Sequence, residues 1–231
     1  MRRKRRPVLS FIILILLAAV ITLVYLVSSN PRLEPTRAVA GYDSLEAFKT
    51  AKLGEAVKSA ITGLNSNVDI TVDQDELSGL TDLLVKELES SSGKMKFDGH
   101  SGRFVDGRIE IKLDSTLLKV LPVQYSFRLL PSVEDNKIKI HIESVKIGKL
   151  GIPAKTVLKL LDLSGNSSYY VNAESQNVYI SNNNSEQFTF KDLQIKDEKL
   201  QLSVELSINN IKDLVKSLDL VLPEQFKQFL N

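Results

Sequence analysis

The alternation of apolar and polar residues is strongest in the middle of the chain, where it predicts a β-hairpin. In residues 123–130, and more strictly in residues 137–143, every second side chain is apolar, so each segment has one buried face and one wet face. Proline, serine, two acids and an asparagine occur between the two segments. Because these residues favour reversal, and because proline cannot extend a central strand, we expect residues 131–136 to form the turn.

A glycine-containing corner follows this hairpin and leads into a predicted helix. Gly148 and Gly151 give the backbone freedom to change direction. Pro153 suits the first turn of a helix that continues to Leu161. We expect the rest of the chain to be arranged around this hairpin, corner and helix.

Two more helices are predicted before the central stretch. Residues 42–64 have apolar positions at helical spacing, and two interpretations stay open for them: a helix folded on the domain, or a dimerising stalk. Asp73 or Asp75 caps a second, amphipathic helix that continues through Leu88. The apolar face expected for this helix consists of Leu77, Leu80, Leu83, Leu84 and Leu88.

Short segments with a strand-like pattern flank these helices and the central stretch. They cover residues 68–72, 94–97, 103–105, 109–113, 169–171 and 178–180, with a last hairpin that begins at Phe188 and ends at Ile208. Residues 98–102, which include His100, are expected to be a glycine-rich turn, and helical spacing returns at residues 211–218. The pattern predicts an α+β fold in which a curved antiparallel sheet packs with long amphipathic helices.

The N-terminal segment has a different pattern, because residues 8–27 form a run of about 20 residues without a charge, the length that a bilayer core requires. The basic cluster at residues 2–6 precedes it, so the positive-inside rule places the N-terminus in the cytoplasm. We therefore expect a single-pass protein of the cell membrane. A cleaved signal peptide is the alternative, since small residues follow Val27. The expected organisation is a cytoplasmic tail at 1–7, an anchor at 8–28, a stalk and helix at 29–66, and an extracytoplasmic domain at 67–231.

Charge and composition narrow the range of functions. The formal net charge is +2, but the N-terminal cluster accounts for it and the remainder is slightly acidic, so we expect no nucleic-acid partner. The chain has no cysteine and two separated histidines, which excludes disulfides and thiolate sites and argues against zinc. Most carboxylates fall on outward faces of strands or helices. We therefore expect no metal, no cofactor and no catalytic site.

The remaining candidate for function is the apolar surface itself. One-sided strands and leucine-faced helices provide more apolar side chains than a thin sheet needs to bury. Two interpretations follow: an ordinary core, or a groove between sheet and helix that receives acyl chains. The candidate groove residues are Leu80, Leu84, Tyr125, Phe127, Ile138, Ile140 and Ile142.

Several motifs between Val68 and Leu161 also occur together in a known family. They are Asp75-Glu76-Leu77, Leu83-Leu84, Phe127-Arg128-Leu129-Leu130-Pro131, Asp135-Asn136-Lys137, residues 145–153 and Val157-Leu158. With its basic N-terminus and single anchor, the chain resembles the YpmS family of anchored proteins in Gram-positive bacteria. It is more distantly similar to tubular lipid-binding (TULIP-like) domains. The chain departs from the family at residues 42–64 and after Ser164.

The resemblance implies a long helix along a curved antiparallel sheet, an extracytoplasmic location and no catalytic motif. Our leading hypothesis is therefore non-catalytic binding of a lipid or a lipid-linked cell-envelope intermediate. The alternative is a scaffold that contacts a protein partner during envelope assembly or secretion.

Overall fold

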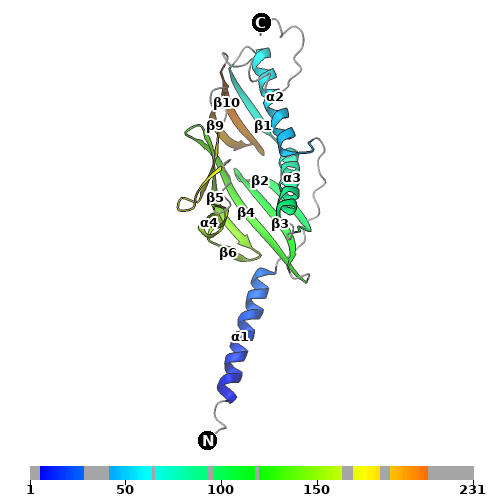
Figure 1. Cartoon of the computed structure of the whole chain (residues 1–231), viewed down its shortest axis with the longest axis vertical. Coiled ribbons are helices and arrows are strands. Elements are labelled where there is room, and N and C mark those ends of the chain that lie inside the picture. Colours follow the sequence, from blue (N-terminus) through cyan, green and yellow to red (C-terminus); the bar gives the residue numbers. More distant parts are fainter. Residues whose placement is uncertain are drawn as a thin grey trace.

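The computed structural model describes residues 6–28, 42–63, 66–92, 96–117, 120–162, 169–182 and 188–207. It confirms an α+β fold with antiparallel sheets (Figure 1). The helices are α1 (Arg6–Val27), α2 (Leu45–Gly63), α3 (Gln74–Ser92) and α4 (Ala154–Asp162). The strands are β1 (Asn67–Val72), β2 (Gly99–Val105), β3 (Arg108–Leu117), β4 (Leu121–Glu134), β5 (Lys137–Ile147), β6 (Leu150–Ile152), β7 (Tyr169–Asn172), β8 (Asn177–Ser181), β9 (Phe188–Lys196) and β10 (Lys199–Leu206).

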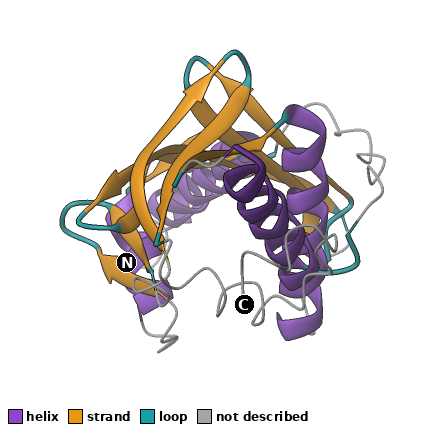
Figure 2. Cartoon of the chain, turned by 90° about the horizontal axis from the view of Figure 1, so that it is seen from above, coloured by secondary structure: helices purple, strands orange, loops and turns teal. Residues whose placement is uncertain are grey.

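The larger sheet has the strand order β2-β3-β4-β5-β8-β7, with β6 paired to β5. The predicted hairpin is confirmed as β4 and β5. Seen from above, the strands curve around the helices (Figure 2). A β-bulge at Glu143 lets Leu129 face Ile142 while Arg128 faces Ser144. The extra residue changes the phase of the alternation, so Ile142 and Val145 both enter the cluster beneath α4.

The turn of this hairpin is shorter than the sequence indicates. β4 continues through Pro131 to Glu134, and only Asp135 and Asn136 form the turn, both with positive φ. Proline is tolerated at position 131 because β3 pairs with β4 only as far as Leu129, which leaves that side of β4 without a ladder partner. The expectation that residues 131–136 form the turn is therefore wrong.

A smaller sheet has the order β1-β10-β9. β1 and β10 pair in register from Asn67 opposite Glu205 to Val72 opposite Leu200. The helix predicted at residues 42–64 is confirmed as α2, and its buried residues Ala56, Val57 and Ala60 pack against this sheet. Of its two interpretations, the structure shows the helix folded on the domain.

Helix α3 begins with a capping box. The backbone nitrogen of Glu76 donates to Asp73 Oδ1 at 2.9 Å, and the backbone nitrogen of Asp73 donates to Glu76 Oε2 at 3.1 Å. The helix buries Leu77, Thr81 and Val85, whereas Leu84 and Leu88 are exposed. The leucine face expected from the sequence is therefore only partly buried.

Close packing of α3 on β2 explains why Thr81, and not Leu84, lies on the buried face of the helix. A Cβ added to Gly102 would lie 2.2 Å from Thr81 Oγ1, so the lack of a side chain at Gly102 allows the helix to approach the strand closely. Gly102 and His100 belong to strand β2, not to the glycine-rich turn expected for residues 98–102. His100 is buried there against α3, and its Nε2 lies 3.5 Å from Asp82 Oδ1.

Helix α1 ends against the larger sheet, with Ser28 in an antiparallel bridge to Val123. Its side chains are described from Leu17 onward. Over the part of the chain that the structure describes, no helix has the length and apolar content needed to cross a membrane. The expected stalk at residues 30–41, the helical periodicity at 211–218 and the basic residues 2–5 lie outside the described residues.

Candidate functional site

An apolar groove of about 530 Å³ lies between the two sheets and is covered on one side by α2. Strand β5 contributes Ile138 and Ile140, and the other lining residues come from both sheets and from α2. They are Phe48, Lys49, Lys52, Leu53, Ile70, Val72, Ile109, Pro131, Ile180, Ser181, Asn182, Phe188, Phe190, Leu193, Leu200 and Leu202. Most of these side chains are apolar, so the groove offers an apolar surface with polar groups at few positions.

Strand alternation directs these side chains into the groove. Ile138 lies opposite Ile180 in the pairing of β5 with β8, and both line the groove. Leu200 and Leu202 are two residues apart on β10 and share the face that looks toward them. The wall formed by the smaller sheet is therefore built by the same period-two pattern as the wall formed by the larger sheet.

Asn136 fixes the two walls relative to each other. Its side-chain oxygen accepts hydrogen bonds from the backbone nitrogen of Phe190 at 2.7 Å and from Nδ2 of Asn182 at 3.2 Å. Nδ2 of Asn182 also donates to the backbone oxygen of Phe188 at 2.7 Å. The turn between β4 and β5 in the larger sheet thus holds β9 of the smaller sheet.

Two lysines of α2 supply the charge among the lining residues. Lys52 Nζ lies 2.5 Å from Glu76 Oε1, which joins α2 to the start of α3. Burial alone would lower the pKa of Lys52, but the hydrogen bond to Glu76 and the charges of Glu76 and Glu55 outweigh it and raise that pKa. Lys52 therefore stays charged, and Lys49 is exposed one turn earlier.

The structure distributes the seven predicted groove residues over several places. Ile138 and Ile140 line the groove. Ile142 is buried under α4, and Phe127 packs against the same cluster. Leu80 packs beside Val72, Leu77 and Phe104, Leu84 is exposed, and Tyr125 is half-buried near the end of β4 that contacts α1.

Sequence reasoning missed the wall formed by β1, β9 and β10. Its strands were predicted, and their alternation was a usable signal for apolar faces. The pairing of β1 with β10 joins residues as distant as Asp69 and Ser203, whose side chains are hydrogen-bonded at 2.6 Å. A local pattern carries no information on such a pairing.

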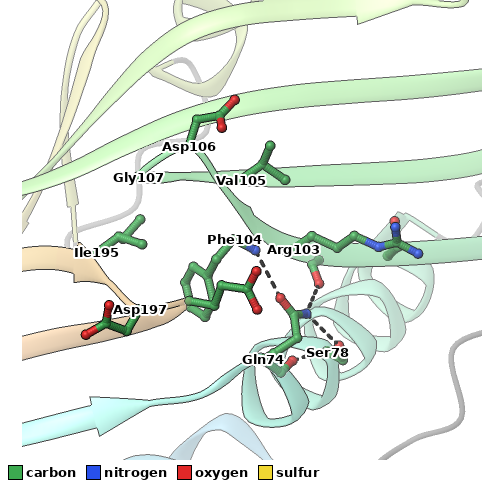
Figure 3. A pocket seen from close by; sticks show the side chains of 12 residues that line it. Gln74, Ser78, Arg103, Phe104, Val105, Asp106, Gly107, Ile195 and Asp197 are labelled. Carbon is green, nitrogen blue, oxygen red and sulfur yellow. Dashed lines mark hydrogen bonds between the residues drawn. The ribbon is translucent and has the colours of Figure 1, made fainter.

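A second, more polar cavity of about 680 Å³ lies where the β2–β3 and β9–β10 turns meet α3. Gln74 reaches from α3 to β2, as Figure 3 shows: Nε2 donates to the Gly102 oxygen at 2.7 Å, and Oε1 accepts from the Phe104 nitrogen at 3.1 Å. Gln74 thus replaces a missing strand partner at the edge of the sheet. Its role in this cavity is to hold α3 on β2.

Several titratable side chains of the described residues form ion pairs between different elements. Arg108 Nε lies 2.6 Å from Glu143 Oε2, and this hydrogen bond lowers the pKa of Glu143. Burial lowers the pKa of His100, although the charge of Asp82 acts in the opposite direction. No group of three or more potential metal ligands gathers within the described residues.

The geometry of the apolar groove makes it the candidate functional site, since the polar contacts elsewhere are explained by packing of the elements. Comparison of the chain with family models, with curated proteins and with solved structures finds no match in any of the three.

Proposed function

We propose that this protein is a non-catalytic, membrane-anchored extracytoplasmic domain that binds a lipid or a lipid-linked cell-envelope intermediate in its apolar groove. The observation that carries this proposal is the groove between the two sheets, with a volume of about 530 Å³. That volume falls in the range typical of small-molecule sites, which is roughly 300–1,000 Å³.

The chemistry of the lining favours an acyl chain over a polar ligand. Side chains such as Ile138, Phe190 and Leu202 offer no hydrogen bond to a ligand, and their shared property is apolar surface. Each methylene that leaves water for such a surface contributes about 0.8 kcal/mol. An aliphatic chain can therefore be held without a charged site in the groove.

The polar lining residues favour an anionic or neutral head group. They are Lys49, Lys52, Ser181 and Asn182, and no carboxylate is present among the residues that line the groove. Lys52 is already paired with Glu76, which offsets part of the positive charge of the two lysines. An anionic head group beside the lysines is still attracted to their ammonium groups, whereas a cationic head group is repelled. We therefore propose an anionic amphiphile as the preferred ligand class.

The proposed location rests on the sequence and not on the structure, because no helix among the described residues meets the length and apolar content of a membrane span. The uncharged segment at residues 8–27 and the basic cluster before it support a retained anchor with the domain outside the cell. The resemblance to YpmS-like and tubular lipid-binding proteins supports the same location and ligand class. The curved sheet and long helices agree with the coarse fold that this resemblance implies.

Tryptophan quenching tests the proposal, because the natural chain contains no tryptophan. Phe190→Trp places a reporter in the groove, and Phe97→Trp places a matched reporter outside it. The full chain in detergent is titrated with a brominated fatty acid, whose bromine quenches tryptophan only on close contact. We expect saturable quenching at position 190 and little at position 97. Equal, non-saturable quenching at both positions would refute the groove as a lipid site.

A protein–protein scaffold is the second candidate function. Leu84 and Leu88 lie one turn apart on α3, and 42% and 48% of their surfaces are exposed. A photo-crosslinking residue at Leu84, with one at exposed Lys86 as control, tests this candidate in cells. One discrete crosslinked partner that depends on position 84 would favour the scaffold, provided that quenching at Phe190→Trp is absent.

A further inference from the structure

The end of the domain that meets α1 has features that the groove does not use. Helix α1 is joined to this end through the backbone: Ser28 bridges Val123, and the Lys149 nitrogen donates to the Leu26 oxygen at 2.7 Å. The Gly148 nitrogen donates to the Gln124 oxygen, also at 2.7 Å. The last turn of the helix, strand β4 and the β5–β6 turn therefore form one hydrogen-bonded joint.

Gly148 is required by the geometry of this joint. Its φ is +60°, and an added Cβ would lie 2.3 Å from the Val27 oxygen and 2.6 Å from the Leu26 oxygen. Those neighbours are backbone atoms, which cannot move away as a flexible side chain can. Gly151, in the same motif, has open space where a Cβ would be added. One glycine of the corner is thus explained by the helix that it contacts.

Side chains around the joint match the chemistry of a membrane interface. Lys149 Nζ lies 3.8 Å from the centroid of the Tyr25 ring, and Tyr25 is 64% exposed. Tyrosine and lysine are typical of the head-group region, where an aromatic ring contacts the boundary and an ammonium contacts phosphate. Lys146 is also exposed, three residues before Lys149.

An exposed apolar side chain lies at the same end. Val120 is 80% exposed at the turn before β4, three residues before the Val123 that bridges Ser28. In Figure 1 the β3–β4 hairpin ends at the level where α1 enters the domain. A valine in that position loses contact with water only if something covers it.

We propose that this end of the domain is a second membrane contact, in which Val120 enters the interfacial layer and Lys149 binds lipid phosphate beside Tyr25. This inference rests on the proposed anchor, because the bilayer that holds residues 8–28 is the partner. The hydrogen-bonded joint at Gly148 keeps the two contacts at a fixed distance. The domain therefore stands on the bilayer at one height and does not move freely on a tether.

Single-cysteine labelling tests the contact, because the chain has no cysteine of its own. Environment-sensitive fluorophores are attached to Val20→Cys, Val120→Cys and Lys137→Cys in the full chain, reconstituted in nanodiscs of phosphatidylglycerol and phosphatidylcholine. Two disc preparations are compared: in one the lipids carry a quencher in the middle of the acyl chain, and in the other they carry it at the head group. We expect mid-chain quenching at position 20, which lies near the centre of the proposed span, and head-group quenching at position 120. We expect neither at position 137, which lies at the opposite end of β5.

The outcomes separate this inference from the proposed anchor. Quenching at position 20 without quenching at 120 overturns the membrane contact and leaves the anchor intact. No quenching at position 20 refutes the anchor itself. Quenching at all three positions shows a domain that lies flat on the bilayer, and overturns the fixed upright arrangement.

Two substitutions then test the joint and the phosphate contact. Gly148→Ala in the Val120→Cys background is expected to abolish most of the quenching, while Gly107→Ala, which also replaces a glycine with positive φ but in open space, leaves it unchanged. Lys149→Gln keeps the backbone joint, and we expect it to reduce quenching more in phosphatidylglycerol discs than in pure phosphatidylcholine discs, where choline balances the charge of each phosphate. Unchanged quenching in both Gly148→Ala and Lys149→Gln overturns the inference.

Discussion

The side-chain oxygen of Asn136 lies 2.7 Å from the backbone nitrogen of Phe190, and this hydrogen bond joins the turn of one hairpin to the first strand of another. Asn136 has a φ of +56°, which glycine also adopts readily. Asn136→Gly therefore removes the contact without straining the turn. The same oxygen also accepts a hydrogen bond from Nδ2 of Asn182, so the variant loses two hydrogen bonds. We expect a loss of about 2 kcal/mol in the free energy of unfolding, at about 1 kcal/mol for each bond, measured by urea denaturation.

Asp135→Gly is the matched control for this variant, since Asp135 occupies the other turn position with a φ of +50°. Equal stability of the two glycine variants would show that Asn136 does not hold the sheets together. Weaker lipid-dependent quenching at Phe190→Trp in the Asn136→Gly background alone would connect the contact to the groove.

The approach of α3 to β2 predicts a coupled pair of substitutions. Gly102→Ala places a methyl group 2.2 Å from the present position of Thr81 Oγ1, and we expect it to lower the free energy of unfolding by about 1–3 kcal/mol. Adding Thr81→Ala removes the clashing atom, so the double variant is expected to lose less than the sum of the single losses. Gly151→Ala, in open space, is the control. Strict additivity in the double-mutant cycle would contradict this packing.

Two isoleucines on one strand are expected to differ in their contribution to stability. Ile142 is 6% exposed within the cluster under α4, so Ile142→Ala is expected to cost about 3 kcal/mol through lost burial and the cavity left behind. Ile138 lines the open groove and is only half-buried, so Ile138→Ala is expected to cost about 1 kcal/mol. Thermal or urea unfolding measures both. Equal costs would indicate that the groove is closed in solution.

The lowered pKa of His100 leads us to expect that the free energy of unfolding decreases in acid. Burial lowers its pKa in the folded state below the ordinary value of 6.5, and the charge of Lys86 acts in the same direction, while Asp82 and Glu89 oppose the shift. Below pH 6.5 the unfolded chain binds the proton more readily than the folded chain, so the free energy of unfolding falls as pH decreases. The effect is absent above the unfolded-state pKa, where His100 is neutral in both states.

The measurement is the free energy of unfolding from pH 7.5 to pH 5. We expect the decline in this window to be shallower in His100→Gln, because that side chain does not titrate. Lowered pKa values at Glu143 and Glu174 act only at lower pH, around and below their ordinary value of 4.5. An identical slope in the variant would assign the decline to other groups.

Much of the local structure follows from the sequence, because strand alternation and helix caps are short-range signals. The alternation of Ile138 with Lys139 identifies a strand, and the pair Asp73 and Asp75 indicates the start of α3, for which the structure selects Asp73 as the cap. The phase change at Glu143 and the continuation of β4 through Pro131 depend on what the neighbouring strands do. These features are therefore not visible in the pattern of a single segment.

The candidate site was predicted only for the wall that lies in the central hairpin. Ile138 and Ile140 line the groove, whereas Leu84 is exposed because Gly102 and Thr81 determine how α3 is rotated. The opposite wall depends on pairing between β1 and β10, which are far apart in the sequence. Periodicity identifies which side chains share a face, but not which faces meet.

The position of the groove along β4 determines how a ligand could arrive. Val123 contacts the end of α1, Pro131 lines the groove, and the strand between them spans about 27 Å at its usual rise per residue. If the domain stands upright on its anchor, an acyl chain in the groove has left the lipid layer completely. A lipid that moves laterally in the surrounding leaflet does not reach a groove at that height. We therefore expect delivery by a carrier or a neighbouring protein that reaches the distal end of the domain.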